Sequence, residues 1–322
     1  MLNPADFKTT NPLDSVSIRY ANEQADFIAD NIFHPMPVPK SDFKVWQYDT
    51  SNYRYVSSKK SSKAEADTID YSGFYTSKKA ELRKLKGMID PADERDFDAV
   101  VGDVEEDTAM SVMDRLLIDK EVDAATLCNT TTNYPSDLTS TLGSTATWAS
   151  DGGDPEADAR TARVAVKARC GKAANALALS WTAFEYLKTS AALKDRVKYT
   201  SGQSLSEEQI KNILQVQYLF ICKAQKNTNV EGNATQTLSD IWNDSALFFV
   251  YDPAPRRKKV CYGIQGIRNE VKSRVFNDEK LGSGDGPVRF VETSWWYNLS
   301  AGAVVSSSDS DFAAGYCLAN VY

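Results

Sequence analysis

The sequence predicts an α+β fold. Segments with apolar side chains at helical spacing occupy much of the first two thirds of the chain, and strand-like apolar runs dominate the last third. The two kinds of segment are mixed without a strict strand–helix–strand alternation, and no internal repeat is visible. The 322 residues are 42% hydrophobic, so they can bury the core of one large domain or two ordinary ones.

The first 40 residues predict an arm followed by a short helix. Residues 1–19 are polar and lack periodicity, which is typical of an extended segment. Apolar residues at helical spacing predict a helix over residues 21–33. Pro35 should end it, because proline disfavours helical geometry in the residue before it.

A long two-stranded excursion is expected next. The segment Ser57–Thr68 (SSKKSSKAEADT) is too polar to bury a core, so we expect a mobile loop tip. Two strand-like runs flank it, Lys44–Val56 and Gly73–Met88. Because an isolated hairpin is marginally stable in water, this excursion needs a surface to lie on.

A long acidic helix should follow the excursion. Asp90 and Pro91 are a strong helix start, with the aspartate as cap and the proline at the first helical position. Apolar residues then recur at close to the helical period as far as about Leu127. Such a helix would be roughly 55 Å long.

The excursion and the acidic helix carry opposite charge. Ser57–Lys86 holds eight basic and four acidic residues, whereas Asp90–Asp123 holds thirteen acidic and three basic ones. One interpretation is two separately solvated surfaces. Our hypothesis is that the basic excursion of one copy rests on the acidic helix of the next, since matched charges fix register and speed encounter. The candidate contact residues are Lys59, Lys60, Lys63, Lys78, Lys79, Arg83, Lys84, Asp93, Glu94, Asp103, Glu105, Glu106 and Asp107.

Three further helices and five strands complete the prediction. Helices are expected over Glu156–Lys172 after an Asp154-Pro155 start, over Trp181–Lys198, and over Ser206–Leu214 with a capping box. In the first of these, three basic residues share one face that could meet DNA or a neighbouring molecule, or could simply be solvated: Arg160, Arg163 and Lys167. The expected strands are Gln217–Ala224, Ala246–Tyr251, Val260–Ile267, Val288–Ala301 and Gly315–Val321, with a loop at Lys280–Pro287.

The sequence holds no recognisable catalytic or metal-binding motif. His34 is the only histidine, and no nucleophile is placed beside it. The five cysteines are far apart and form no CxxC pair, which indicates buried free thiols in a reducing compartment. Glycine-rich phosphate-binding patterns are absent. We therefore expect no enzyme activity, cofactor or metal.

Charge and hydropathy exclude further classes. The net charge of −7 argues against a protein whose main task is gripping nucleic acid, although it allows nucleic acid to be enclosed. The N-terminal residues lack the basic and apolar regions of a signal peptide, and no apolar run is long enough for a membrane span.

Two stretches carry a family resemblance. They are Tyr20–Asp49 (YANEQADFIADNIFHPMPVPKSDFKVWQYD) and Thr237–Pro253 (TLSDIWNDSALFFVYDP). In these two stretches the chain resembles the major capsid proteins of tailed bacteriophages with the Hong Kong 97-like fold. The two stretches cover under a sixth of the chain, but their order and spacing also agree. Departures from the family pattern lie at Ala254–Lys259 and Trp295–Tyr297.

The resemblance implies a peripheral domain with a long spine helix and a β-sheet, an axial domain, an N-terminal arm and an extended β-hairpin loop. It places the arm at residues 1–40, the extended loop at 41–89, the peripheral domain at 90–174 and 286–305, and the axial domain at 175–285 and 306–322. Axial loops at Thr200–Ser204 and Val230–Thr235 would meet around the symmetry axes. Some relatives crosslink a loop lysine to an asparagine, but no matching asparagine is identified in this sequence.

The implied function is that of a structural protein of an icosahedral phage head around double-stranded DNA. The partners implied are the chain itself in pentamers and hexamers, a scaffolding protein, a portal, DNA without sequence-specific contact, and in some cases a decoration protein. The implied location is the virion, after assembly in the bacterial cytoplasm. Two alternatives remain open at this point: an encapsulin-like protein compartment, and a soluble hydrolase or binding domain.

Overall fold

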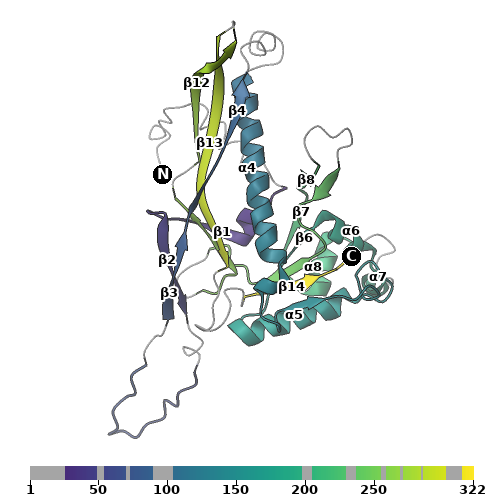
Figure 1. Ribbon diagram of the computed structural model, residues 1–322. Helices are drawn as coiled ribbons and strands as arrows, with labels where there is room; N and C mark the ends of the chain where they lie inside the picture. Colours follow the sequence, from purple (N-terminus) through teal and green to yellow (C-terminus); the bar gives the residue numbers. More distant parts are fainter. Residues whose placement is uncertain are drawn as a thin grey trace.

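The computed structural model describes residues 26–48, 54–69, 73–89, 104–197, 205–229, 237–254, 259–268, 271–283, 286–301 and 314–322. These residues form an elongated part, built along the long helix α4 (Val104–Asn129), and a compact lobe at the lower end of that helix (Figure 1). A two-stranded ribbon, β2 (Asp42–Tyr48) and β3 (Gly73–Lys79), leads away from both. The predicted mixture of helix and sheet is confirmed.

The elongated part is a sheet centred on the longest strand, β13 (Gly286–Ala301). The other strands are β1 (Phe33–Pro37), β4 (Glu81–Ile89), β11 (Gly263–Ile267) and β12 (Lys272–Ser283). Strands β4 and β12 pair antiparallel with the same stretch of β13, so they lie at its two opposite edges. We call these three strands, β4, β13 and β12, the blade.

One face of the blade packs on α4. Ala109 of α4 lies in a buried cluster with Ile89 and Val291. Further along the helix, apolar residues pack on two aromatic residues of β13, and this cluster comprises Met113, Leu117, Trp295 and Tyr297. A Cβ at Gly87 would collide with the Thr108 side chain, so β4 approaches the helix more closely than a side chain would allow. The described helix has 26 residues and is about 39 Å long; the predicted start at Asp90 lies outside the described residues.

The compact lobe contains a five-stranded sheet flanked by four helices. In sheet order its strands are β5 (Thr139–Thr141), β14 (Gly315–Ala319), β10 (Ala246–Phe249), β6 (Ala176–Ser180) and β7 (Tyr218–Cys222). The helices are α5 (Pro155–Cys170), α6 (Trp181–Thr189), α7 (Ala191–Val197) and α8 (Glu207–Leu214). Every residue of β6 and β10 is buried, so both faces of the sheet centre are covered. The lower end of α4 enters this core through Ala124, Ala125 and Cys128.

Three short pieces complete the described structure. They are α2 (Ala29–Ile32), the 3-10 turn η3 (Thr131–Asn133), and a small ribbon of β8 (Gln225–Asn227) and β9 (Leu238–Asp240).

The local signals for two helices are confirmed. The Asp154 side chain accepts hydrogen bonds from the backbone N–H groups of Glu156 and Ala157, with Pro155 at the first helical position of α5. Ser206 and Gln209 form the predicted capping box of α8. In both cases the side chains satisfy N–H groups that a helix start leaves unpaired.

The predicted helix Trp181–Lys198 is instead two helices. Ser190 leaves the helical region, with φ −52° and ψ 129°, and its N–H donates to the carbonyl of Leu187. The Ser190 carbonyl then accepts from Lys194 at the start of α7. This break lets Leu193 reach the lobe core, where it is 1% exposed.

The predicted helix over residues 21–33 differs more. Within the described residues only Ala29–Ile32 is helical, and Pro35 lies inside strand β1 rather than ending a helix. β1 is the edge strand of its sheet, where a residue without an N–H group is tolerated.

Each of the five predicted strands contains a strand, with shorter ends at most of them, but β6, β12 and the short strands β1, β8 and β9 were missed. The all-buried run of β6 has no alternation that distinguishes it from a helix. The predicted loop at Lys280–Pro287 is mostly strand, because β12 reaches Ser283 and β13 begins at Gly286. The pairing also joins β11 and β12 to β13, whereas the predicted domain division separates them. Likewise α5 packs on the lobe, although the prediction placed it with the long helix.

Candidate functional site

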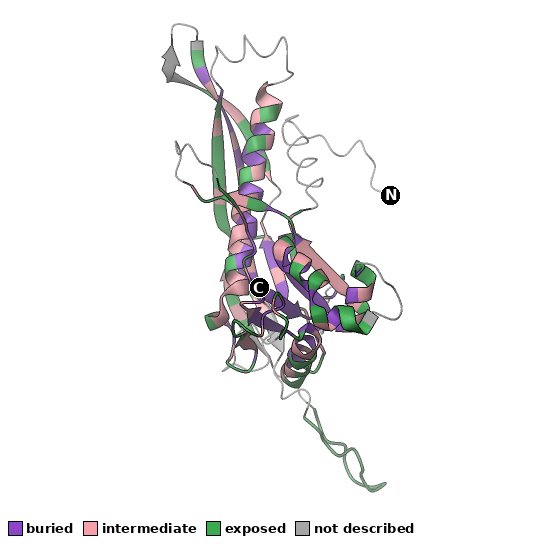
Figure 2. Cartoon of the chain, turned by 90° about the vertical axis from the view of Figure 1, so that its right-hand side faces the viewer, coloured by how far each residue is buried: buried purple, intermediate pink, exposed green. Residues whose placement is uncertain are grey.

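The ribbon of β2 and β3 ends in a segment without support from the described chain. All residues from 54 to 69 are exposed, and Figure 2 shows them in green beyond the body of the molecule. Two of its apolar side chains are far in solvent, Tyr55 at 88% and Ile69 at 68%. An ion pair between Lys60 and Asp67, at 2.8 Å, links the two sides of the tip. The predicted loop tip is therefore free of packing contacts that would hold it on the described part of its own chain.

The base of the same ribbon is anchored. Phe43 and Ala80 are buried with Val38 in a small apolar cluster. A Cβ at Gly266 would collide with the Phe43 ring, so the ribbon base lies tightly on β11. The extension thus has a fixed origin and an unsupported end.

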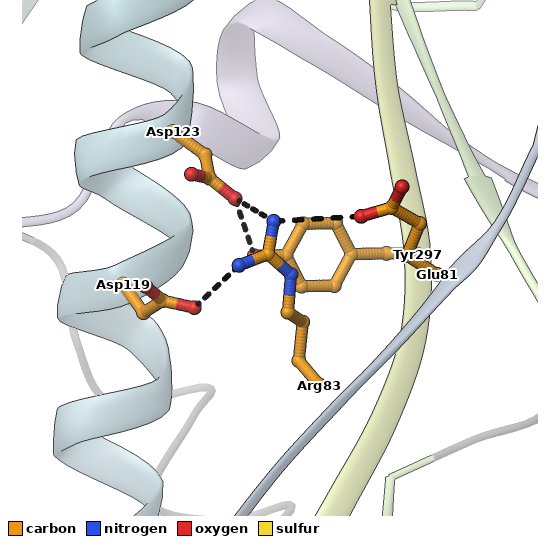
Figure 3. A network of polar contacts seen from close by, with 5 residues as sticks. All are labelled: Glu81, Arg83, Asp119, Asp123 and Tyr297. Carbon is orange, nitrogen blue, oxygen red and sulfur yellow. Dashed lines mark hydrogen bonds and ion pairs between the residues drawn. The ribbon is translucent and has the colours of Figure 1, made fainter.

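One turn of α4, residues 119–123, contacts the elongated sheet, the segment at residues 28–30 and the lobe. The guanidinium of Arg83 on β4 lies 2.9 Å from a carboxylate oxygen of Asp123 and 3.4 Å from one of Asp119, both on α4 (Figure 3). Tyr297 of β13 donates to Asp123 at 3.2 Å. Burial, followed by the nearby carboxylates, raises the pKa of Tyr297, so its hydroxyl remains a donor.

The same turn of α4 carries two buried ionisable side chains, Glu121 and Lys120. One carboxylate oxygen of Glu121 accepts from the backbone N–H groups of Ile28 and Ala29 at 3.1 and 2.9 Å. The other accepts from the indole of Trp242 at 2.7 Å, in the segment before β10. Burial raises the pKa of Glu121, and these hydrogen bonds oppose that rise. The carboxylate therefore ties the start of α2, the long helix and the lobe at one point.

Lys120 completes this junction. Its ammonium pairs with Asp30 of α2 and lies 4.3 Å from the ring centroid of Trp295. Burial lowers the pKa of Lys120, and the Asp30 carboxylate opposes that shift. No local sequence signal distinguishes these two charges from the rest of the acidic helix, so the junction was not predicted.

The predicted contact residues fall into three groups. Lys59, Lys60 and Lys63 lie at the exposed tip, while Asp93, Glu94 and Asp103 lie outside the described residues. Lys78 and Lys79 are on β3, Arg83 and Lys84 on β4, and Glu105, Glu106 and Asp107 in the first turn of α4. Ion pairs within the chain engage Lys60 with Asp67, Arg83 with Asp119 and Asp123, and Glu105 with Arg289. Basic strand and acidic helix therefore already meet inside one copy.

The three basic residues predicted to share one face of α5 differ in their surroundings. Arg160 and Lys167 are exposed, and Arg163 donates to the side chain of Gln215 at 2.6 Å. Thr200–Ser204 and Val230–Thr235, the predicted axial loops, lie outside the described residues.

The described residues offer little for chemistry. No group of three or more His, Cys, Asp or Glu side chains in them could hold a metal ion. All five cysteines are free, and Cys128, Cys170, Cys222 and Cys317 are buried, as expected for structural thiols. Burial raises the pKa of Cys317 to about 12, far from the range of a reactive thiolate. Among the described helices none is long and apolar enough to cross a membrane.

Comparison with known proteins gives the fold its context. No protein-family model matches the chain. The major capsid protein of Burkholderia phage BcepMu is 18% identical over 283 residues, a match that covers 84% of this chain and 87% of the relative. A phage-related protein from Bordetella bronchiseptica RB50 has a solved structure with a TM-score of 0.70 at 20% identity, covering 96% of each chain. The capsid structure of Cyanophage P-SCSP1u gives a TM-score of 0.56 at 10% identity, covering 91% of this chain and 88% of that one.

An elongated sheet backed by one long helix, a compact lobe and an unsupported ribbon define an α+β fold of the phage-capsid class. The Hong Kong 97-like fold is the one predicted, and the capsid structures that superimpose on the chain agree with it. The predicted resemblance to phage major capsid proteins is also confirmed, by a curated relative of that name.

Proposed function

We propose that this chain is the major capsid protein of a tailed bacteriophage, a structural protein without enzymatic activity. Copies of it assemble into a closed icosahedral shell around double-stranded DNA. The observation that carries the proposal is the ribbon of β2 and β3, whose end from residue 54 to residue 69 is exposed throughout. A relative named as a major capsid protein supports the same conclusion.

The physical reason lies in the stability of such a ribbon. A two-stranded extension is marginal alone and exposes apolar side chains such as Tyr55 and Ile69. An adjoining copy can supply the surface that its own chain lacks. Repeated around rotation axes, such a head-to-tail contact closes into rings of five and six and then into a shell.

The partners follow from that role. The chain contacts itself in pentamers and hexamers, a scaffolding protein guides the first assembly, and a portal occupies one vertex. DNA is enclosed without sequence-specific contact, consistent with a net charge of −7. Assembly takes place in the host cytoplasm, and the product is the virion. The division into arm, extended loop, peripheral domain and axial domain is part of the same proposal.

Electron microscopy of the purified chain tests the proposal. With a scaffolding protein or at high concentration, negative stain should show closed shells of uniform size. A variant in which residues 54–69 are replaced by a short glycine-serine turn should keep its circular dichroism spectrum, because that segment is exposed and packs on no described part of the body. The variant should form no shells. Monomers or dimers of the full chain under all conditions would contradict the proposal. Particles filled with protein cargo instead of DNA would favour an encapsulin-like compartment.

A further inference from the structure

The blade has a second face, turned away from α4. Residues of β13 that contact the helix are Val291, Trp295 and Tyr297, all at odd positions. Because successive side chains of a strand point to opposite sides, the even positions face the other way. No described helix packs on that side of the blade. We call it the outer face.

Strand register gives the composition of the outer face. Directly paired residues share a face, so each row can be read across the three strands. The rows in which every side chain is described are Met88–Phe290–Phe276, Lys86–Glu292–Arg274, Lys84–Ser294–Lys272 and Leu82–Trp296. Arg268 adds a fifth cation, 4.9 Å from the Trp296 ring centroid.

The outer face carries a marked excess of positive charge. Among the side chains of this face that the structure describes, one carboxylate stands against the five cations: Glu292, which pairs with Arg274 at 2.9 Å. Lys86 lies 4.3 Å from the ring centroid of Phe290. Lys84 and Lys272 are exposed and have no ion pair with any described residue. These two lysines flank Ser294 from both sides, so they are available to an anionic group laid over β13.

Apolar side chains frame these cations. Met88 is 63% exposed at one end, and Leu82 is 41% exposed at the other. Both stand beside aromatic residues of the same face, Phe290 and Trp296. Exposed apolar groups inside a charged patch are typical of a protein-binding surface.

We propose that the outer face binds an acidic, extended polypeptide segment of an accessory protein. Lys84 and Lys86 are two residues apart on one strand, about 7 Å, which is also the spacing of every second residue in an extended peptide. Carboxylates at alternate positions of the segment meet the lysine rows, and its apolar residues cover Met88 and Leu82. This partner is additional to the self-assembly proposed above and does not depend on it.

Two other occupants fit less well. Duplex DNA would match the cations, but its phosphates would leave Met88 and Leu82 without an apolar partner, and the net charge of −7 repels it. A twofold contact between two copies would place the same positive face against itself, because such contacts are made by identical patches. An acidic polypeptide satisfies both the charge and the apolar surface.

Fluorescence anisotropy tests the proposal with the full-length chain. The probe is a short labelled peptide of alternating glutamate and valine, compared with a glutamate–serine peptide and a labelled DNA duplex. The unmodified chain should bind the glutamate–valine peptide, and more weakly as salt is added. The double variant Lys84→Glu with Lys272→Glu should lose about tenfold or more in affinity. Its matched control, Lys172→Glu with Lys194→Glu, makes the same charge change at exposed positions of the lobe and should bind normally.

A second variant tests the apolar part. Met88→Ser should weaken binding of the glutamate–valine peptide and leave the glutamate–serine peptide nearly unchanged. Equal binding of the peptide by the double variant and the unmodified chain would overturn the proposal. Tighter binding of the DNA duplex, lost in the same double variant, would overturn it in favour of nucleic acid. Circular dichroism of each variant shows that the fold is retained, since all the substituted side chains are exposed.

Discussion

Glu121 and Lys120 are neighbours on α4, and each is only 1% exposed. Burying a charge is costly unless hydrogen bonds or an opposite charge compensate it. Both are compensated by groups distant in sequence: backbone N–H groups of residues 28 and 29 and the Trp242 indole for the carboxylate, and Asp30 for the ammonium. These contacts hold the segment after the N-terminal arm at a fixed place on the long helix.

Glu121→Gln should lower the free energy of unfolding by about 2 kcal/mol, measured by denaturant titration with tryptophan fluorescence. An amide accepts at one end only, so its NH₂ group would face either the Trp242 indole or two backbone N–H groups. Glu185→Gln is the matched control, since Glu185 makes only a surface ion pair with Lys188. That control should change stability by less than about 0.5 kcal/mol.

The effect of Glu121→Gln should also depend on pH. Burial raises the pKa of Glu121, so the folded protein keeps this proton at pH values where the unfolded chain has lost it. The contribution of the group to stability is complete below the ordinary value of 4.5 and declines as pH rises through the raised value. The deficit of the variant is therefore largest in acid and shrinks toward neutral pH. A deficit that grows with rising pH would show that the carboxylate is held in its charged form.

Among the elements, β4 and α4 pack closely enough to exclude a side chain at Gly87. At Gly87 a Cβ would lie far inside contact distance of Thr108 and 3.0 Å from the Val112 side chain. Strand and helix thus approach each other to a distance that only glycine permits. Arg83 then reaches the helix carboxylates two turns further along.

Gly87→Ala should separate β4 from α4 and cost about 1 to 3 kcal/mol of unfolding free energy. Gly143→Ala is the control, because nothing lies within 4 Å of a Cβ at that position. Differential scanning calorimetry should show a lower Tm for the first variant and an unchanged Tm for the second. Equal Tm values would mean that Thr108 can rotate away without loss.

Sequence patterns predicted those elements whose signals are local. The starts of α5 and α8 were found because Asp154 and Ser206 cap their own helices. The break at Ser190 and the strand character of Pro35 were missed because packing decides both. Strand β12 was missed because its glycine-containing end has the composition of a loop. Its pairing with β13 also cannot be deduced from the sequence of β12 alone.

The candidate site was predictable only in part for the same reason. The exposed lysines of the tip were predicted from the composition of their segment, which is too polar to be buried in a core. The junction joins Glu121 to Trp242, which lies 121 positions further along the chain, and the outer face needs the register of three strands. Neither arrangement has a signature within one stretch of sequence.

At the scale of the whole molecule, the projecting tip at residues 54–69 carries basic side chains and the start of α4 carries acidic ones. The exposed tip carries Lys59 and Lys63 without a described partner, and the first turn of α4 presents Glu106 and Asp107. Arg83 on β4 shows the same pairing of basic strand with acidic helix inside one copy. Between copies, we expect the tip to meet the helix start of its neighbour through the remaining charges.

Reversing the tip charge, by Lys59→Glu with Lys63→Glu, should slow assembly and leave the fold intact, since both side chains lie in solvent. Complementary charge speeds encounter, so the assembly rate of the unmodified chain should fall as salt is added, and the rate of the variant should not. Light scattering at two salt concentrations measures both rates, with Lys172→Glu and Lys194→Glu as the matched control. Adding Asp107→Lys to the reversed tip should restore part of the rate if the two surfaces meet. If the tip variant assembles at the unmodified rate, the tip finds its neighbour through its apolar residues, Tyr55 and Ile69, rather than through its charge.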